Sequence, residues 1–155
     1  MAKSILSLLV GCAIDDGYVS GLDMPVKDVF PELSYYDGEN DVTIGDLLNM
    51  TAGLDWKESY YNPFGITARF YYTKDLTDLV LNFKFNSEPG KKYVYQSGAT
   101  QLASLMLDSI LIKKGTSLSE YASERFWKKI GAEEGALWSL DRLGGVEKGF
   151  CCFLG

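Results

Sequence analysis

The sequence opens on MAKSILSLLVGCAIDDG, residues 1–17, and this stretch determines how the rest of the chain has to be arranged. Apolar residues cover almost the whole circumference of the helix that it predicts. A helix that is apolar all round is expected to be buried on all sides. Gly17 should end the helix, because glycine adopts the left-handed conformation of a C-cap without strain.

Lys3 is the one charge in the first turn of this predicted helix. The positive end of the helix dipole disfavours a cation there. Burial would lower the pKa of the amine further. A lysine with a lowered pKa is a candidate general base. The alternative is an exposed, solvated lysine on a fraying terminus.

The chain is expected to be one partial domain, residues 1–155, cut at both ends. The predicted buried helix starts with no N-cap residue. Residues 150–155 stop within an apolar run that would need strand partners. A chain of 155 residues fits one domain with a real core. We therefore expect the rest of a longer parent chain to be a partner of this segment.

Composition excludes several function classes. An apolar fraction of 46% and an aromatic fraction of 14% indicate a globular protein. The net charge is −6 with no basic patch, which argues against a nucleic-acid partner. No apolar run reaches membrane-spanning length.

Histidine is absent, so neither a Ser-His-Asp triad nor a histidine zinc site can form within the chain. The three cysteines lack metal-ligand spacing, and we expect neither a metal nor a cofactor.

Four further helices and one strand are predicted from periodicity and capping signals. Thr43 is a suitable N-cap for the first of these helices, Ser97 for the third, and Ser117 with Glu120 forms a capping box for the fourth. The expected helices cover residues 43–50, 75–83, 98–114 and 118–129, and the strand starts near Gly149.

Tyr95 and Ser97 lie at the start of the predicted helix over residues 98–114. The positive potential at a helix N-terminus favours a phenolate, so the pKa of Tyr95 could be lowered there. The alternatives are a half-buried aromatic side chain for Tyr95 and simple helix capping for Ser97.

Residues 55–72 are rich in aromatic side chains, among them Trp56 and Tyr60. Such a cluster could line a ligand cleft, with Trp56 and Tyr60 as substrate-binding residues. The alternative is a large aromatic core under a long loop.

Four stretches, in this order, resemble the serine β-lactamase and penicillin-binding-protein superfamily. MAKSI at residues 1–5 looks like the start of its active-site helix, and TIGDLLNMTAGL at residues 43–54 like a segment of its class C branch. PGKKYVYQSG at residues 89–98 is similar to the Tyr-x-Asn region, with Ser97 in place of Asn, as in nylon-oligomer hydrolases and related esterases. Residues 119–127 fit the helix that follows.

The resemblance implies an α+β parent fold, of which this segment supplies the active-site helix and most of the helical subdomain. It also implies a bacterial serine hydrolase, periplasmic or extracytoplasmic, that forms an acyl-enzyme on a small-molecule or peptide substrate. Lys3 and Tyr95 would be its catalytic residues and Ser97 would bind substrate. No Ser-x-x-Lys occurs within residues 1–155, and the motif serine would fall just before Met1. The alternative is a non-catalytic module that binds peptide or cell wall in the same cleft.

Overall fold

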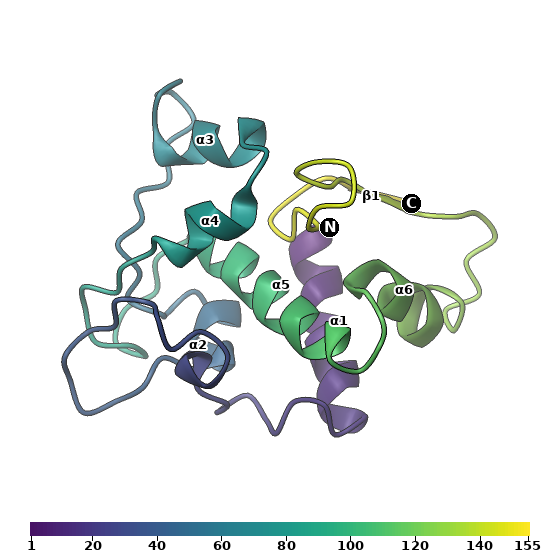
Figure 1. Cartoon of the computed structure of the whole chain (residues 1–155), viewed down its shortest axis with the longest axis horizontal. Coiled ribbons are helices and arrows are strands. Elements are labelled where there is room, and N and C mark those ends of the chain that lie inside the picture. The colour runs from purple at the N-terminus through teal and green to yellow at the C-terminus, as the bar shows by residue number, and fades with distance from the viewer.

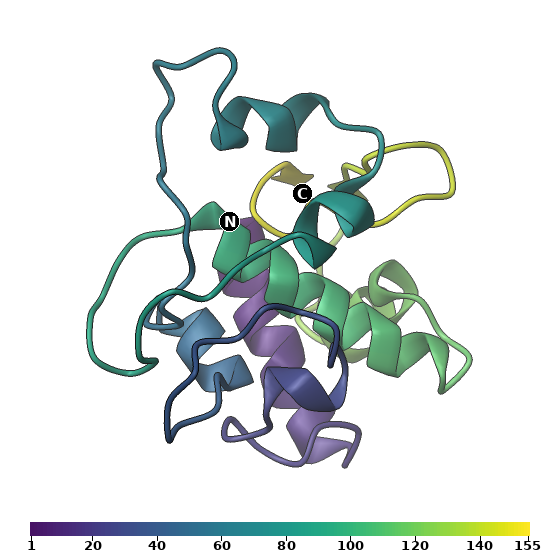
Figure 2. The same ribbon diagram turned by 60° about the vertical axis from the view of Figure 1, so that its left-hand side comes forward.

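The computed structural model describes all 155 residues and is organised around two long helices. These are α1 (Ala2–Asp15) and α5 (Ser97–Ile112), which pack against each other. In Figures 1 and 2, α5 runs through the middle of the molecule and α1 crosses behind it. A core of 35 buried apolar residues surrounds this crossing. No helix is long and apolar enough to cross a membrane.

Helix α1 ends as the sequence predicts but is not buried on all sides. Gly17 adopts the left-handed conformation, with φ of +71°. Leu6, Leu9 and Val10 are fully buried, whereas Leu8 is 50% exposed. The expectation of burial all round was wrong because nothing in the chain covers the side of α1 on which Leu8 lies. Two serines and a glycine share that side: Ser4, Ser7 and Gly11.

Helix α2 (Ile44–Leu48) carries the predicted capping box and packs against α5. Asp46 N–H donates to Thr43 Oγ1 at 3.1 Å, and Thr43 N–H donates back to the Asp46 carboxylate at 3.0 Å. The helix is shorter than the predicted range because Met50 takes a left-handed conformation with φ of 60°. The sequence therefore predicts the N-terminal capping box of α2 correctly but not the residue at which the helix ends.

The segment after α2 forms an aromatic cluster over α5. It contains α3 (Ile66–Tyr72) and α4 (Leu76–Leu81), and Asp75 caps α4, which was predicted as 75–83. Trp56 packs edge-on against Phe70 and Phe83, with ring centroids 4.5 and 5.7 Å apart. Trp56 and Phe70 are both buried, so the aromatic-core interpretation holds for this part of residues 55–72.

The predicted helix 118–129 is divided in two. The Ser117–Glu120 capping box is confirmed and opens α6 (Leu118–Ala122), which continues into a π-helical turn, η2 (Ser123–Trp127). Arg125 in this turn pairs with Asp16 at the end of α1, at 2.6 Å. The turn is thereby held against the first helix.

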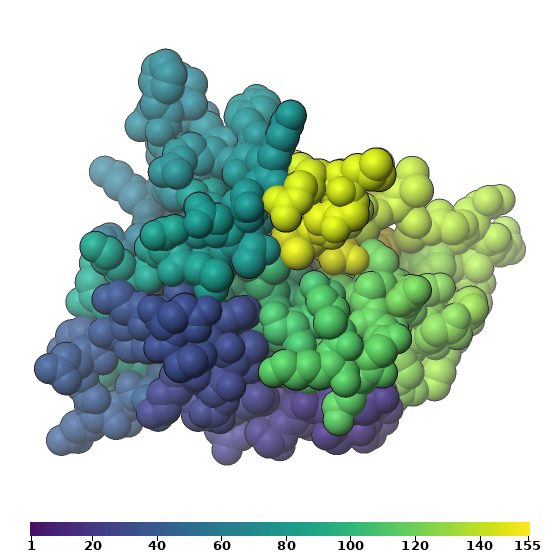
Figure 3. Space-filling model, in the orientation of Figure 1, coloured from purple at the N-terminus to yellow at the C-terminus, as the bar shows by residue number.

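The C-terminal residues return to the helices through a short hairpin. Strands β1 (Leu137–Trp138) and β2 (Phe153–Leu154) are antiparallel, with Trp138 opposite Phe153. The strand expected from Gly149 begins later, after Cys152, which has a φ of 64° and forms a disulfide with its neighbour Cys151. Figure 3 shows this C-terminal segment in yellow between the teal region of α3 and α4 and the green region of α6.

The remaining ordered element is a single 3-10 turn, η1 (Val26–Asp28), in the connection between α1 and α2. The structure is therefore mainly helical with one small two-stranded sheet, which agrees with the expected α+β class.

Candidate active site

The first turn of α1 and the first turn of α5 meet at Lys3. Its Nζ donates to Ser97 Oγ at 3.2 Å and to Thr100 Oγ1 at 3.3 Å. The same Nζ lies 4.9 Å from the centroid of the Tyr95 ring. Three candidates from two distant stretches of sequence, Lys3, Tyr95 and Ser97, are thus brought together.

Lys3 is partly buried at this junction, and burial lowers the pKa of its amine from 10.5 to about 8. The negative charge of Glu58 opposes this effect. The expected direction of the pKa shift is confirmed, and burial is its main cause. At pH 7 an amine with a pKa near 8 is neutral in about one molecule in ten, far more often than a free lysine, and the neutral form is the one that can act as a general base.

The expected lowering of the Tyr95 pKa was wrong. Burial raises the pKa of Tyr95, and the charge of Glu58 raises it further, with smaller effects from Tyr93 and Tyr71. The helix dipole does not act as expected because the Glu58 carboxylate accepts the N–H of Ser97, the first residue of α5, at 2.9 Å. An anion in that place offsets the positive potential of the helix end. The Tyr95 hydroxyl therefore keeps its proton and can donate it.

Ser97 is not the helix cap that the sequence predicted. Gln96 is the N-cap residue of α5 and makes no side-chain capping bond. Ser97 is the first helical residue, and its hydroxyl donates to Glu58 Oε1 at 2.7 Å while it accepts from Lys3. Capping fails here because the side chain is engaged by Glu58 and Lys3 instead of the amides of its own helix.

Glu58 is the residue that sequence reasoning missed. Its carboxylate accepts four hydrogen bonds: from Ser97 N and Oγ, from Trp56 Nε1 at 2.5 Å and from the Tyr60 hydroxyl at 2.7 Å. Burial opposes the charge of Glu58, but the hydrogen bonds from Ser97, Tyr60 and Trp56 outweigh it and lower the pKa. The alternation Trp56-x-Glu58-x-Tyr60 was a usable signal, because alternate residues of an extended chain share one side.

Trp56 and Tyr60 occupy different environments although both bond to Glu58. The indole of Trp56 is 6% exposed and lies against Gly98, where an added Cβ would stand 2.6 Å from the ring. Tyr60 is 63% exposed, and its hydrogen bond to Glu58 raises its pKa to about 12. Tyr60 also lines an open hollow of about 440 Å³ with Tyr61, Tyr71 and Tyr72. The substrate-binding roles expected for Trp56 and Tyr60 stay predictions.

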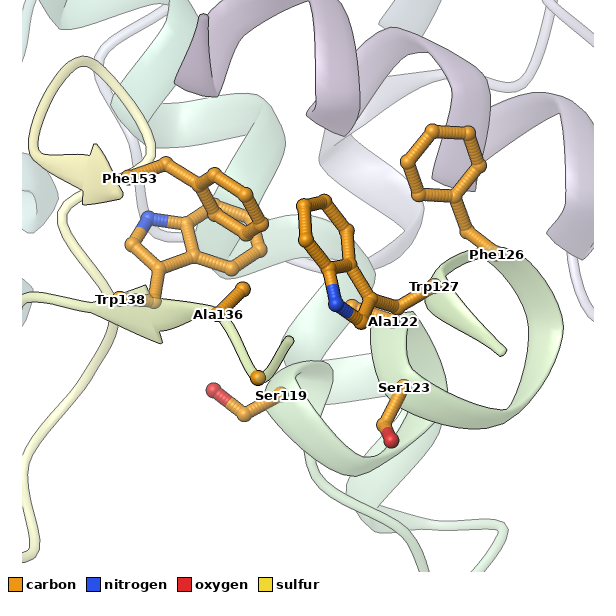
Figure 4. A pocket seen from close by; sticks show the side chains of 9 residues that line it. Ser119, Ala122, Ser123, Phe126, Trp127, Ala136, Trp138 and Phe153 are labelled. Atoms are coloured by element: carbon orange, nitrogen blue, oxygen red, sulfur yellow. The ribbon is translucent and has the colours of Figure 1, made fainter. Parts of the chain in front are cut away.

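A second hollow, of about 200 Å³, lies between η2 and the β1–β2 hairpin and shares no residue with the Lys3 cluster. Figure 4 shows Trp127, Trp138 and Phe153 around it. Its lining is mostly apolar, with Ser119 and Ser123 as its side-chain hydroxyls. No lysine, tyrosine or carboxylate lines this hollow.

The Lys3 cluster can move protons, but it holds no free nucleophile. The Ser97 hydroxyl proton is already donated to Glu58. No three His, Cys, Asp or Glu side chains come together in a way that could hold a metal ion.

The family model described as Beta-lactamase matches residues 1–142. The chain belongs to the Beta-lactamase family. This places it among the serine β-lactamases and penicillin-binding proteins, the superfamily that its motifs resemble. Related proteins of this family are hydrolases.

Solved structures of the Beta-lactamase superfamily share the fold of this chain. A putative 6-aminohexanoate-dimer hydrolase from Bacillus anthracis has a TM-score of 0.75 at 20% identity, over 98% of this chain and 42% of that one. A penicillin-binding protein from Bacillus halodurans has a TM-score of 0.67 at 20% identity, over 92% and 43%. A D-stereospecific amidohydrolase from Streptomyces sp. has 0.59 at 17%, over 96% and 50%.

At these identities the likeness shows the fold alone. The chain spans half or less of the length of each of these structures. A search of curated proteins found no match.

Proposed function

We propose that residues 1–155 are part of a longer serine hydrolase that forms an acyl-enzyme on an amide or ester, with Lys3 and Tyr95 as its proton-transfer groups. The observation that carries the proposal is the position of Lys3. Its amine has a lowered pKa, bonds to the uncharged hydroxyls of Ser97 and Thr100, and lies against the Tyr95 ring. Family membership supports the same chemistry.

In the proposed reaction, the hydroxyl oxygen of a serine one helical turn before Lys3 attacks the substrate carbonyl. Ser-x-x-Lys spacing would place that serine just before Met1. A new C–O bond forms, and neutral Lys3 takes the hydroxyl proton. The bond to the leaving amine or alcohol breaks when that group receives a proton, from Lys3 or from Tyr95, whose raised pKa keeps it protonated. A water molecule then attacks the acyl carbonyl and gives a proton to neutral Lys3. The C–O bond to the serine breaks, and the serine oxygen takes that proton back from Lys3.

The substrate class stays broad within this proposal. The names of the structural neighbours refer to a linear amide dimer, penicillin binding and D-stereospecific amide hydrolysis. The proposed substrate of this protein is a β-lactam, a D-amino-acid peptide, an ester or a linear amide. The alternative is a non-catalytic module that binds peptide or cell wall in the same cleft. The residue encoded before Met1 separates the two: serine supports the enzyme, and Gly, Ala or Asp supports the module.

Acylation of the full-length protein tests the proposal. A fluorophosphonate or activated ester should add one acyl or phosphonyl group, measured by intact mass. Lys3→Ala should abolish this addition and Tyr95→Phe should slow it by about 100- to 10,000-fold, the usual contribution of a general acid–base group. Lys27→Ala, which removes an exposed lysine paired with Asp41, is the matched control and should acylate normally. Acylation of Lys3→Ala at the wild-type rate would overturn the proposal.

A further inference from the structure

We propose that Glu58 is a positioning residue. It accepts the hydrogen bond of the Ser97 hydroxyl and so fixes Ser97 as a hydrogen-bond acceptor for Lys3, which leaves the Lys3 lone pair free to accept a proton. The task of that lone pair rests on the proposed function. The hydrogen-bond directions rest on the geometry alone.

The direction of the bond between Ser97 and Glu58 follows from a count of protons. A serine hydroxyl has one proton and two lone pairs, and an ionised carboxylate can only accept. The Ser97 Oγ to Glu58 Oε1 distance of 2.7 Å is typical of a hydroxyl donating to a carboxylate. The Ser97 proton is therefore committed to Glu58. The bond of 3.2 Å between Lys3 and Ser97 must then have Lys3 as its donor.

Two hydroxyl oxygens, those of Ser97 and Thr100, accept hydrogen bonds from the Lys3 amine. A neutral amine carries two N–H groups and one lone pair. Lys3 Nζ lies 3.2 Å from Ser97 Oγ and 3.3 Å from Thr100 Oγ1, so the two hydroxyls can take both N–H groups. The lone pair is then left without a donor from either hydroxyl. Without Glu58, Ser97 could donate its proton to that lone pair and block it.

Glu58 is itself held in place, so the arrangement is preorganised. Its Oε2 accepts from the Ser97 amide and from the Trp56 indole, and its Oε1 accepts from the Ser97 and Tyr60 hydroxyls. Trp56 is buried in the aromatic core, which fixes the donor on that side. A role limited to capping α5 would need only the bond to the Ser97 amide, whereas here each carboxylate oxygen takes two donors.

The negative charge of Glu58 also acts on the pKa of Lys3. It is the one charged group that shifts the Lys3 pKa, and it raises that pKa against the effect of burial. The other titratable groups of the cluster, Tyr60 and Tyr95, have raised pKa values and are neutral. The two hydrogen bonds of the Lys3 amine go to uncharged groups, the hydroxyls of Ser97 and Thr100. Removing the Glu58 charge should therefore lower the Lys3 pKa.

The Lys3 pKa can be measured in the 155-residue chain itself by NMR of 13C-labelled lysine. The wild-type amine should titrate near pH 8. In Glu58→Gln it should titrate at lower pH, by on the order of one unit. Glu133→Gln, an equal loss of charge at an exposed residue, is the matched control and should leave the titration unchanged. Titration of Lys3 at the same pH in all three proteins would overturn the inference.

A second variant, Ser97→Ala, tests whether Glu58 acts on Lys3 through the Ser97 hydroxyl. It also provides a test if Glu58→Gln does not fold. Ser97→Ala leaves the Glu58 charge but removes an acceptor that binds the ammonium more strongly than the amine, so the Lys3 pKa should fall. The combined variant should fall by less than the sum of both, because the two changes act on one chain of hydrogen bonds. An unchanged Lys3 pKa in Ser97→Ala, or full additivity, would contradict the inference.

The same variants separate this inference from the proposed function. If the full-length protein fails to acylate while Glu58→Gln still shifts the Lys3 titration, the proposed function fails and the positioning role stands. In the opposite case, the acylation rate of the wild type falls as the pH drops below about 8, and Glu58→Gln does not shift this fall to lower pH. The positioning role then fails and the proposed hydrolase function stands.

Discussion

Replacing Lys3 by Met should make the folded chain more stable at neutral pH. The Lys3 amine has a pKa of 10.5 when unfolded and about 8 when folded. Between these values the unfolded state binds a proton that the folded state does not. The free energy of unfolding of the wild type should therefore rise as pH rises from 8 to 10.5, and the destabilisation is complete below 8. Methionine has a similar length and carries no charge, so it lacks this destabilisation.

The size of the effect follows from the pKa shift. A shift from 10.5 to about 8 corresponds to about 3 kcal/mol as an upper limit. Because Lys3 is only partly buried, water screens its charge, and we expect about 1–2 kcal/mol. Ser97 keeps its bond to Glu58 in the variant, so no buried donor loses its partner. Lys3→Met should then be more stable than the wild type by about 1 kcal/mol at pH 7.

Urea denaturation of wild type and Lys3→Met at pH 7 and pH 10 measures this difference. The advantage of the variant should shrink towards pH 10, where the wild-type lysine is neutral in the folded state and close to its unfolded pKa. Contributions from ionisable groups other than Lys3 are common to both proteins and cancel in the difference. A variant that is less stable at pH 7, with a gap that does not depend on pH, would refute the burial of Lys3 as the cause of its lowered pKa.

Two further predictions concern packing and buried charge. Gly98→Ala should destabilise the protein by about 1–3 kcal/mol in thermal or urea unfolding, because its Cβ would stand 2.6 Å from the Trp56 ring. Gly11→Ala should stabilise it by about 0.5–1 kcal/mol, because a Cβ at Gly11 would meet nothing within 4 Å. Equal effects of the two substitutions would contradict this packing. Asp108→Asn should be more stable than wild type at pH 7, with a difference that shrinks towards pH 4, because burial and the charge of Glu147 raise the Asp108 pKa above 3.8. A variant less stable than wild type in urea at pH 7 would contradict that reasoning.

Local patterns predicted α1, α2, α4, α5 and α6, but they missed α3 within the aromatic-rich residues 55–72. The capping boxes at Thr43 and Ser117 involve residues three apart, so the sequence contains both partners side by side. Lys3 was also accessible to local reasoning, because its place in the first turn of an apolar helix is a property of residues 1–17. The errors at α1 had a different origin. Whether the side of Leu8 is covered depends on what packs against the helix, which its own periodicity does not contain.

The candidate site was predictable only in part, because its central contact joins distant residues. Glu58 meets Ser97 across 39 positions of sequence, and Lys3 meets Ser97 across 94. Local rules for helix ends assigned a cap to Ser97 and a lowered pKa to Tyr95. The cap assignment failed because the Glu58 carboxylate lies at the N-terminus of α5 and accepts hydrogen bonds from the Ser97 amide and hydroxyl. The pKa assignment failed mainly because burial raises the pKa of Tyr95, and the charge of Glu58 raises it further.

Several charges in the Lys3 cluster lie where local electrostatics and burial disfavour them. A cation stands in the first turn of α1, where the helix dipole disfavours it, and burial lowers its pKa. Glu58 keeps its charge in a partly buried place only because four donors surround it. At Thr43, by contrast, local preference and structure agree. Sequences depart from such agreement chiefly at functional sites, so the conflicts that meet at Lys3 support the proposal that this end of α1 belongs to the active site.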